Sequence, residues 1–262
     1  MNKLAALIDF TPTCEVTLSY LSLLAKKLGT ATVLINIEEE SSNKEEVESK
    51  LEVYGQKVRE QNLKCDTHVE IGDFNSIIDP TLQLLAPQLV VTGTHGIKGL
   101  KQTLFGAHIL KLAQEISIPL LVVQDESKVN EMGIEKMLFS MGPHENFEPT
   151  IDYVASLAKD LNSQVVIYTI IKSSQDLSDA LTHNNNYAKR VFEAVGVPFE
   201  HVIEESQDFS LGFSRQTIHY MEKNPFDMVV MPADASEMYR AFSKTDKENL
   251  ILNTQAVPVL CV

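Results

Sequence analysis

The sequence contains no tryptophan, only three cysteines and no long run of apolar residues. The cysteines, Cys14, Cys65 and Cys261, are far apart and form no Cys-x-x-Cys pair, which argues against a disulfide framework and a cysteine zinc site. Because no run of 18 or more apolar residues occurs, no membrane span is expected. The apolar stretch Leu4–Ile8 is too short for a signal peptide and ends at Asp9, so it predicts a first buried strand in a cytoplasmic protein.

Positive charge is also scarce. The chain has 22 lysine and arginine residues against 36 aspartate and glutamate residues, for a net charge of −14 at pH 7. No basic stripe is present that could neutralise the phosphates of a nucleic acid. The composition therefore predicts neither a nucleic-acid partner nor a membrane partner.

Familiar motifs for catalysis and metal binding are missing as well. The seven histidines form no HxxxH or HExxH pair, so no metal ligands are predicted. Neither a nucleophile elbow nor GxxxxGK[ST] occurs, so no catalytic residue and no Walker-type site are predicted. Cys14 lies near a predicted helix start, where a thiol can be acidified, although a small residue tolerated at that place is the simpler interpretation.

Short apolar runs alternate with helix-length amphipathic segments along the whole chain. The predicted strands of the first half are Leu4–Ile8, Ala31–Ile37, Cys65–Val69, Leu89–Thr92 and Leu120–Val123, and its predicted helices are Thr13–Leu28, Asn43–Gln61, Phe74–Leu85 and Gly106–Glu115. The predicted strands of the second half are Lys136–Met141, Gln164–Ile171, Phe199–Ile203, Met228–Met231 and Val259–Cys261, and its predicted helices are Glu148–Leu161, Asp176–Val195, Phe209–Asn224 and Thr245–Thr254. The run Asn184–Asn186 lies inside one of these helices and is a candidate for a break in it.

The two halves repeat one another. Ile118–Val123 matches Val257–Val262 in order and character, and the match between Leu89–Val91 and Met228–Val230 has the same separation of 139 positions. Strands alternating with helices indicate right-handed crossovers and a parallel sheet covered on both faces. The predicted fold class is therefore α/β, with two tandem doubly wound five-stranded parallel-sheet domains at residues 1–128 and 129–262.

A glycine-rich segment follows the fourth predicted strand. Gly93, Gly96 and Gly99 lie in a loop, and Gly106 opens the next helix. Glycines let backbone N–H groups turn toward a phosphate, and a helix start adds free N–H groups and the positive end of its dipole. Spacing alone leaves open whether this loop cradles phosphate or merely makes tight turns. A Rossmann dehydrogenase is not predicted, because GxGxxG after the first strand is absent.

These residues resemble the universal stress protein family. The family carries Gly-x2-Gly-x9-Gly-[Ser/Thr] after its fourth strand, which Gly93, Gly96 and Gly106 match in spacing, and it has an aspartate at the end of its first strand, which Asp9 matches. The resemblance covers both copies. It implies the strand order 3-2-1-4-5 of the adenine-nucleotide alpha-hydrolase-like fold, with the first and fourth strands flanking the ligand crevice.

The resemblance also implies an ATP site, with magnesium as an optional companion ion. Asp9 matches the residue that contacts adenosine, and Ile37 matches an apolar adenine-pocket position. The positions that match the ribose and phosphate contacts are Thr92, Gly93, His95, Gly96, Gly106, Ala107 and His108. Ala107 departs from the family's Ser or Thr, and the lost hydroxyl is expected to weaken ATP binding by about 1.5–3 kcal/mol.

The second copy lacks these features. Its counterparts of Gly93, Gly96, Gly106, Ala107 and Asp9 are Pro232, Ala235, Thr245, Asp246 and Gly142. Proline removes an N–H donor, and Asp234 and Asp246 would place negative charge against a phosphate. The second copy is therefore expected to be a degenerate domain without ATP. Its expected role is structural, and binding of a different, uncharged ligand stays open as the alternative. Because family members dimerise through their last strands, an intramolecular pseudo-dimer is expected, with further homodimerisation left open.

The resemblance thus implies an ATP-binding stress-response or regulatory module, more consistent with a non-enzyme than an enzyme, acting on a regulatory protein partner that the sequence does not identify. Two alternatives stay open. One is a slow ATPase or related nucleotide-processing enzyme, and the other is a scaffold of the same fold that binds no nucleotide, which Ala107 in particular leaves open.

Overall fold

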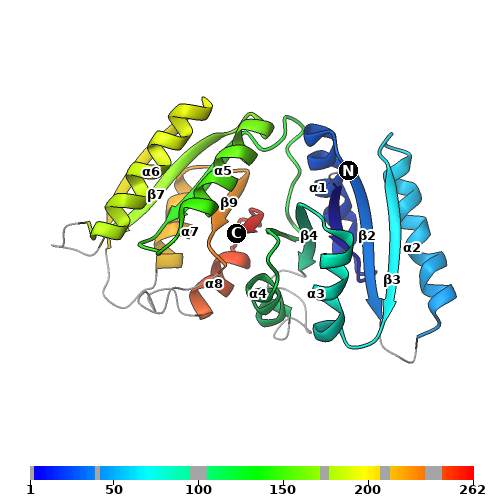
Figure 1. Cartoon of the computed structure of the whole chain (residues 1–262). Helices are drawn as coiled ribbons and strands as arrows, with labels where there is room; N and C mark the ends of the chain where they lie inside the picture. The colour runs from blue at the N-terminus through cyan, green and yellow to red at the C-terminus, as the bar shows by residue number, and fades with distance from the viewer. Residues whose placement is uncertain (1–2, 39–41, 95–104, 172–176, 207–212, 234–243) are drawn as a thin grey trace. The chain divides into compact units, whose positions relative to one another are not determined.

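The computed structural model describes residues 3–38, 42–94, 105–171, 177–206, 213–233 and 244–262 (Figure 1). The chain divides into two compact units, Met1–Val129 and Asn130–Val262. In each unit, strands and helices alternate along the sequence. The predicted loop residues His95 and Gly96 lie outside the described residues.

The first unit contains five strands and four helices among its described residues. They are β1 (Lys3–Leu7), α1 (Thr13–Leu28), β2 (Ala31–Glu38), α2 (Lys44–Arg59), β3 (Cys65–Ile71), α3 (Phe74–Leu85), β4 (Leu89–Thr94), α4 (Phe105–Glu115) and β5 (Leu120–Gln124). The strands pair in parallel in the order β3-β2-β1-β4-β5. Right-handed crossovers in this order place α1 and α2 on one face of the sheet and α3 and α4 on the other.

Local chemistry explains where several helices begin and end. The side chain of Asn43 accepts a hydrogen bond from the backbone N–H of Glu45 and caps α2, and Asp73 caps α3 by accepting from Ser76. Helix α1 ends at Gly29, whose φ of 63° is a left-handed conformation that favours glycine. These caps account for the agreement between predicted and observed helix boundaries.

The core of the first unit surrounds its central strand. Leu4, Ala5 and Ala6 of β1 are fully buried, since the strand has a neighbour on each side and helices above and below. Leu21 and Leu24 of α1 are likewise fully buried. The near-continuous apolar character of β1 is thus a consequence of burial on both faces.

The second unit repeats this plan. Its described elements are β6 (Lys136–Met141), α5 (Glu148–Leu161), β7 (Gln164–Ile171), α6 (Asp179–Val195), β8 (Phe199–Glu205), α7 (Phe213–Lys223), β9 (Met228–Met231), α8 (Lys244–Ile251) and β10 (Val259–Cys261). The parallel strand order is β8-β7-β6-β9-β10, which is the order 3-2-1-4-5 counted within this unit. The predicted fold class is confirmed.

One expectation for the second unit is wrong. Helix α6 is continuous through Asn184–Asn186. The Asn184 amide donates hydrogen bonds to the backbone oxygens of Gly142 and His144, and Asn185 accepts one from Thr169. Asparagine in a helix costs well under 1 kcal/mol per residue relative to alanine, and these tertiary hydrogen bonds outweigh that cost.

Within the described segments, no helix combines the length and the apolar character that crossing a membrane would require. The predicted pairing between the last strands of the two units stays a prediction.

Candidate functional site

The candidate site lies at the carboxyl ends of β1 and β4. These strands are neighbours, with Leu7 opposite Thr92, and their following segments lead to α1 and α4 on opposite faces of the sheet. In doubly wound sheets, ligands bind in the crevice at such a switch point. The structure thus brings Asp9, which follows β1, and Gly93, near the end of β4, to one edge.

Asp9 is exposed, and one of its carboxylate oxygens is held firmly. Oδ1 accepts hydrogen bonds from the Thr11 backbone N–H at 3.1 Å, from the Thr11 hydroxyl at 2.5 Å and from the Cys14 thiol at 3.1 Å. Among the described residues, no hydrogen bond reaches Oδ2. The arrangement orients the carboxylate and leaves one acceptor facing solvent.

Cys14 is a protonated thiol in this arrangement. Its burial, its hydrogen bond to Asp9 and the negative charge of Asp9 raise the pKa of the thiol to about 11. The alternative of an acidified Cys14 at a helix start is therefore wrong, since the neighbouring carboxylate and burial outweigh the helix dipole. Cys14 acts as a donor that positions Asp9.

The residue after Asp9 has an unusual backbone. Phe10 has φ of 59°, a left-handed conformation that is costly for a bulky side chain. Its ring lies 5.8 Å from that of Tyr54, and the Lys50 ammonium lies 4.1 Å from its centroid. These contacts with α2 compensate for the strain and form an aromatic and cationic wall beside Asp9.

Gly93 has a packing reason to be glycine. A Cβ atom there would lie 2.5 Å from Cγ2 of Thr13 and 2.9 Å from the hydroxyl of Thr17, both on α1. Its φ is not positive, so a tight turn does not explain it. Spacing left two interpretations open, a phosphate cradle and tight turns. The structure adds a third that the sequence did not suggest, which is the close approach of α1 to β4. It does not exclude a phosphate contact through the Gly93 backbone.

Thr13 also ties the crevice to the last strand of the unit. Its hydroxyl donates a hydrogen bond to the carboxylate of Asp125, the residue directly after β5. Sequence reasoning missed both residues. Asp125 could have been found as the first charged side chain beyond a predicted strand that ends at the same edge of the sheet.

The remaining predicted residues are distributed around the same edge. Thr92 is buried in β4, and strand alternation turns its side chain away from the α1 face that Gly93 meets. Ile37 is half-buried near the end of β2, two strands from Gly93. The backbones of Gly106, Ala107 and His108 lie in the first turn of α4, where helical N–H groups have no partner within the helix.

These groups fit an adenine nucleotide chemically. The free Asp9 oxygen can accept from a ribose hydroxyl or an amino group, and the first turn of α4 can donate to phosphate oxygens. Among the described residues, no three histidine, cysteine, aspartate or glutamate side chains gather as a metal site.

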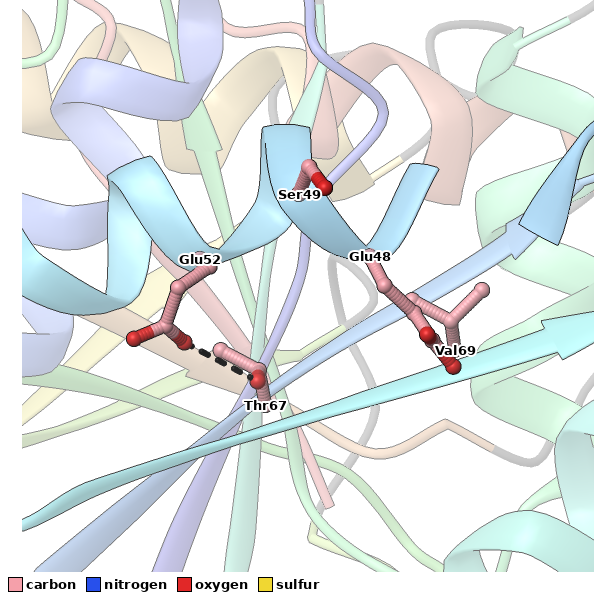
Figure 2. A pocket seen from close by; sticks show the side chains of 5 residues that line it. All are labelled: Glu48, Ser49, Glu52, Thr67 and Val69. Atoms are coloured by element: carbon pink, nitrogen blue, oxygen red, sulfur yellow. Dashed lines mark hydrogen bonds between the residues drawn. The ribbon is translucent and has the colours of Figure 1, made fainter. Parts of the chain in front are cut away.

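A separate groove lies between α2 and the edge strand β3. It has a volume of about 360 Å³ and is lined by Glu48, Ser49, Glu52, Thr67 and Val69 (Figure 2). Figure 2 shows the Glu52 carboxylate directed at the Thr67 hydroxyl, which donates to it at 3.3 Å. In the strand order, β2 lies between the groove at β3 and the switch point between β1 and β4, so this groove is not the candidate site.

Comparison with known proteins identifies relatives of the first unit. The model of the Universal stress protein family matches residues 1–124. No curated protein matches the sequence.

Several solved structures share the fold of the whole chain. A universal stress protein from Archaeoglobus fulgidus DSM 4304 has a TM-score of 0.73 at 15% identity, with 99% of this chain and 95% of that chain covered. A functionally unknown protein from Pseudomonas aeruginosa PAO1 has a TM-score of 0.67 at 16% identity, with 100% and 92% covered. The cytoplasmic domain of a prokaryotic cation chloride cotransporter has a TM-score of 0.58 at 9% identity, with 99% and 94% covered.

Proposed function

We propose that the chain, whose residues 1–124 match the universal stress protein family, binds ATP in its first unit alone. Nucleotide occupancy would bias the conformation of the protein or its binding to a regulatory partner. The observation that carries the proposal is the oriented Asp9 carboxylate beside the end of β4. One of its oxygens accepts from three donors, and no hydrogen bond from the described residues reaches the other.

In this proposal the two ends of the nucleotide meet different chemistry. The exposed Asp9 oxygen accepts from the adenosine part, near Ile37. The phosphates lie against the N–H groups of Gly106 and Ala107 in the first turn of α4, where the positive end of the helix dipole favours negative charge. The loop residues His95 and Gly96 complete the phosphate contacts.

The charge of the crevice favours a magnesium complex over free ATP. Asp9 and Asp125 are both exposed carboxylates at this edge. Two carboxylates would repel free ATP, whereas a bound divalent cation lowers the negative charge of the triphosphate. Binding should therefore be tighter with magnesium present.

Calorimetric titration of the full chain with ATP and magnesium tests the proposal. The expected stoichiometry is near one. The variant Gly106→Asp places a carboxylate in the first turn of α4, where it suits the helix dipole and repels phosphate, so it should abolish binding without unfolding the protein. Gly196→Asn, at a left-handed position in the second unit, is a matched control that should leave binding unchanged.

The outcomes separate the alternatives. A stoichiometry near two would show that the second unit also binds. No binding at millimolar ATP would favour the scaffold alternative that Ala107 leaves open. Unchanged affinity in Gly106→Asp would place the phosphates elsewhere, and release of ADP at a rate that Gly106→Asp abolishes would favour the slow ATPase.

A further inference from the structure

The crevice of the second unit is built differently from that of the first. It lies where β6 and β9 end side by side, with Phe139 opposite Val230. The segments that leave these strands begin at Gly142 and at Pro232, the counterparts of Asp9 and Gly93 in the repeat. Backbone carbonyl groups of both segments point at side chains of the same unit.

Lys247 fills the β9 side of this crevice. Its side chain is 97% buried, as its relative exposure is 3%, and its ammonium donates to the backbone oxygens of Pro232 at 3.1 Å and Ala233 at 2.6 Å. Lys247 lies in the first half of α8, where the helix dipole disfavours a positive charge. A buried ammonium persists in such a place only when hydrogen bonds compensate for its lost hydration.

Asn184 fills the β6 side. Its amide nitrogen donates to the backbone oxygens of Gly142 at 3.0 Å and His144 at 2.9 Å, and its side chain is buried within α6. Both donors therefore come from helices that flank the sheet, and each joins two carbonyl groups of one crevice segment. The two segments are held by side chains in the way that a ligand with several donors would hold them.

Two titratable groups lie close enough to Lys247 to respond to its charge. Burial and the nearby charge of Lys247 lower the pKa of His144 to about 4, so this imidazole is neutral at pH 7. Burial raises the pKa of Cys261 to about 12, and the charge of Lys247 acts in the opposite direction. His144 and Cys261 are therefore uncharged neighbours of Lys247 at pH 7.

The corresponding positions of the first unit carry other residues. The residue 139 positions before Lys247 is His108, and the buried residues of α2, the counterpart of α6, are Leu51, Gly55 and Val58. We propose that the second unit carries its own ligand: the Lys247 ammonium and the Asn184 amide occupy the crevice between β6 and β9 and hold its two segments without any bound small molecule. The proposal concerns the second unit alone and does not depend on ATP binding in the first.

If Lys247 acts as a tethered ligand, an external ammonium should replace it. Lys247→Ala removes the side chain beyond Cβ, and n-propylammonium has the three carbons and the ammonium that are lost. We expect the thermal transition of the variant to fall by about 5 °C or more and to recover in millimolar n-propylammonium. Tetramethylammonium, which has no N–H donor, should not restore it, and the wild type should respond to neither compound.

The location of the effect is measured by amide hydrogen exchange. Lys247→Ala should speed exchange in peptides that contain β9 and β10 and leave peptides of β1 and β2 unchanged. Lys159→Ala, at an exposed lysine of α5, is the matched control and should change neither. Recovery of protection at β9 with n-propylammonium would support the proposal.

A measurement on the wild type keeps the test independent of variant folding. A buried lysine ammonium bonded to carbonyl groups exchanges its protons slowly and should give a nitrogen-correlated proton signal at neutral pH and low temperature. Absence of any such signal would overturn the proposal. So would a Lys247→Ala variant that melts like Lys159→Ala, or one that tetramethylammonium rescues as well as n-propylammonium does.

Discussion

A Cβ atom on Gly93 would lie 2.5 Å from Cγ2 of Thr13. This relationship joins the end of β4 to the first turn of α1, the two elements that frame the candidate site. Gly93, which belongs to a sequence that resembles a phosphate-binding motif, therefore has a packing role at the end of β4 that is separate from any ligand. The packing role of Gly93 can be measured by protein stability, and its ligand role by nucleotide binding.

Gly93→Ala should destabilise the first unit by about 1–3 kcal/mol, because α1 must move to admit the methyl group. Thr13→Ser removes Cγ2 but keeps the hydroxyl that donates to Asp125. The double variant should recover part of the loss, since contacts to the Thr17 hydroxyl and to Cβ of residue 13 remain. Urea unfolding measures both effects, with Thr13→Ser alone as the control. A double variant no more stable than Gly93→Ala would show that Cγ2 is not the obstacle.

Ala107→Ser should tighten ATP binding about fivefold, because a restored hydroxyl in the first turn of α4 can donate to a phosphate oxygen for about 1 kcal/mol. Calorimetry with ATP and magnesium measures the change. Ala113→Ser, on the same helix but away from its first turn, should not tighten binding. Equal affinity of wild type and Ala107→Ser would mean that no phosphate oxygen is within reach of the hydroxyl.

Cys14 should react slowly with thiol reagents. With its pKa at about 11, only about one molecule in a thousand carries the thiolate at pH 8, and the rate should rise tenfold per pH unit up to that pKa. Asp9→Asn removes the carboxylate charge that helps to raise the pKa, so alkylation at pH 8 should become faster. The Cys14→Ser protein provides the background rate from the other two cysteines. A rate that levels off near pH 8 would contradict the assignment.

Acid should destabilise the second unit through His144. Its pKa is lowered from 6.5 to about 4 in the folded protein, so the unfolded chain binds more protons between these values. Stability that is complete above about pH 6.5 is therefore lost as the pH falls toward 4, by up to about 3 kcal/mol. In His144→Gln this pH dependence should flatten. His183→Gln, at an exposed histidine, is the control and should keep the wild-type slope.

Much of the candidate site was accessible from the sequence because its markers are local. Asp9 ends a short apolar run, and Gly93 and Gly106 bracket a strand-to-helix connection, so a rule about strand ends places them together. Phe10, Tyr54 and Lys50 were not accessible, because their contact depends on how α2 packs over the loop after β1. No spacing in the sequence encodes that contact.

The sequence by itself determined the alternation of strands and helices and their boundaries to within a few residues. These properties follow from hydrophobic periodicity and from residues such as Gly29 whose effect is confined to a single turn. They need no knowledge of what lies across the sheet.

Only the tertiary structure decided what the crevice residues do. Burial and the neighbouring Asp9 raise the pKa of Cys14, and Gly93 packs against Thr13. Hydrogen bonds of Asn184 stabilise α6 through the asparagine run. Lys247 is buried against the carbonyl groups of the second crevice. Each of these outcomes depends on desolvation and on hydrogen bonds between segments far apart in the chain. The energies of desolvation and of these hydrogen bonds depend on distances and burial that only packing creates. They are larger than the local conformational preferences on which the sequence-based predictions rest.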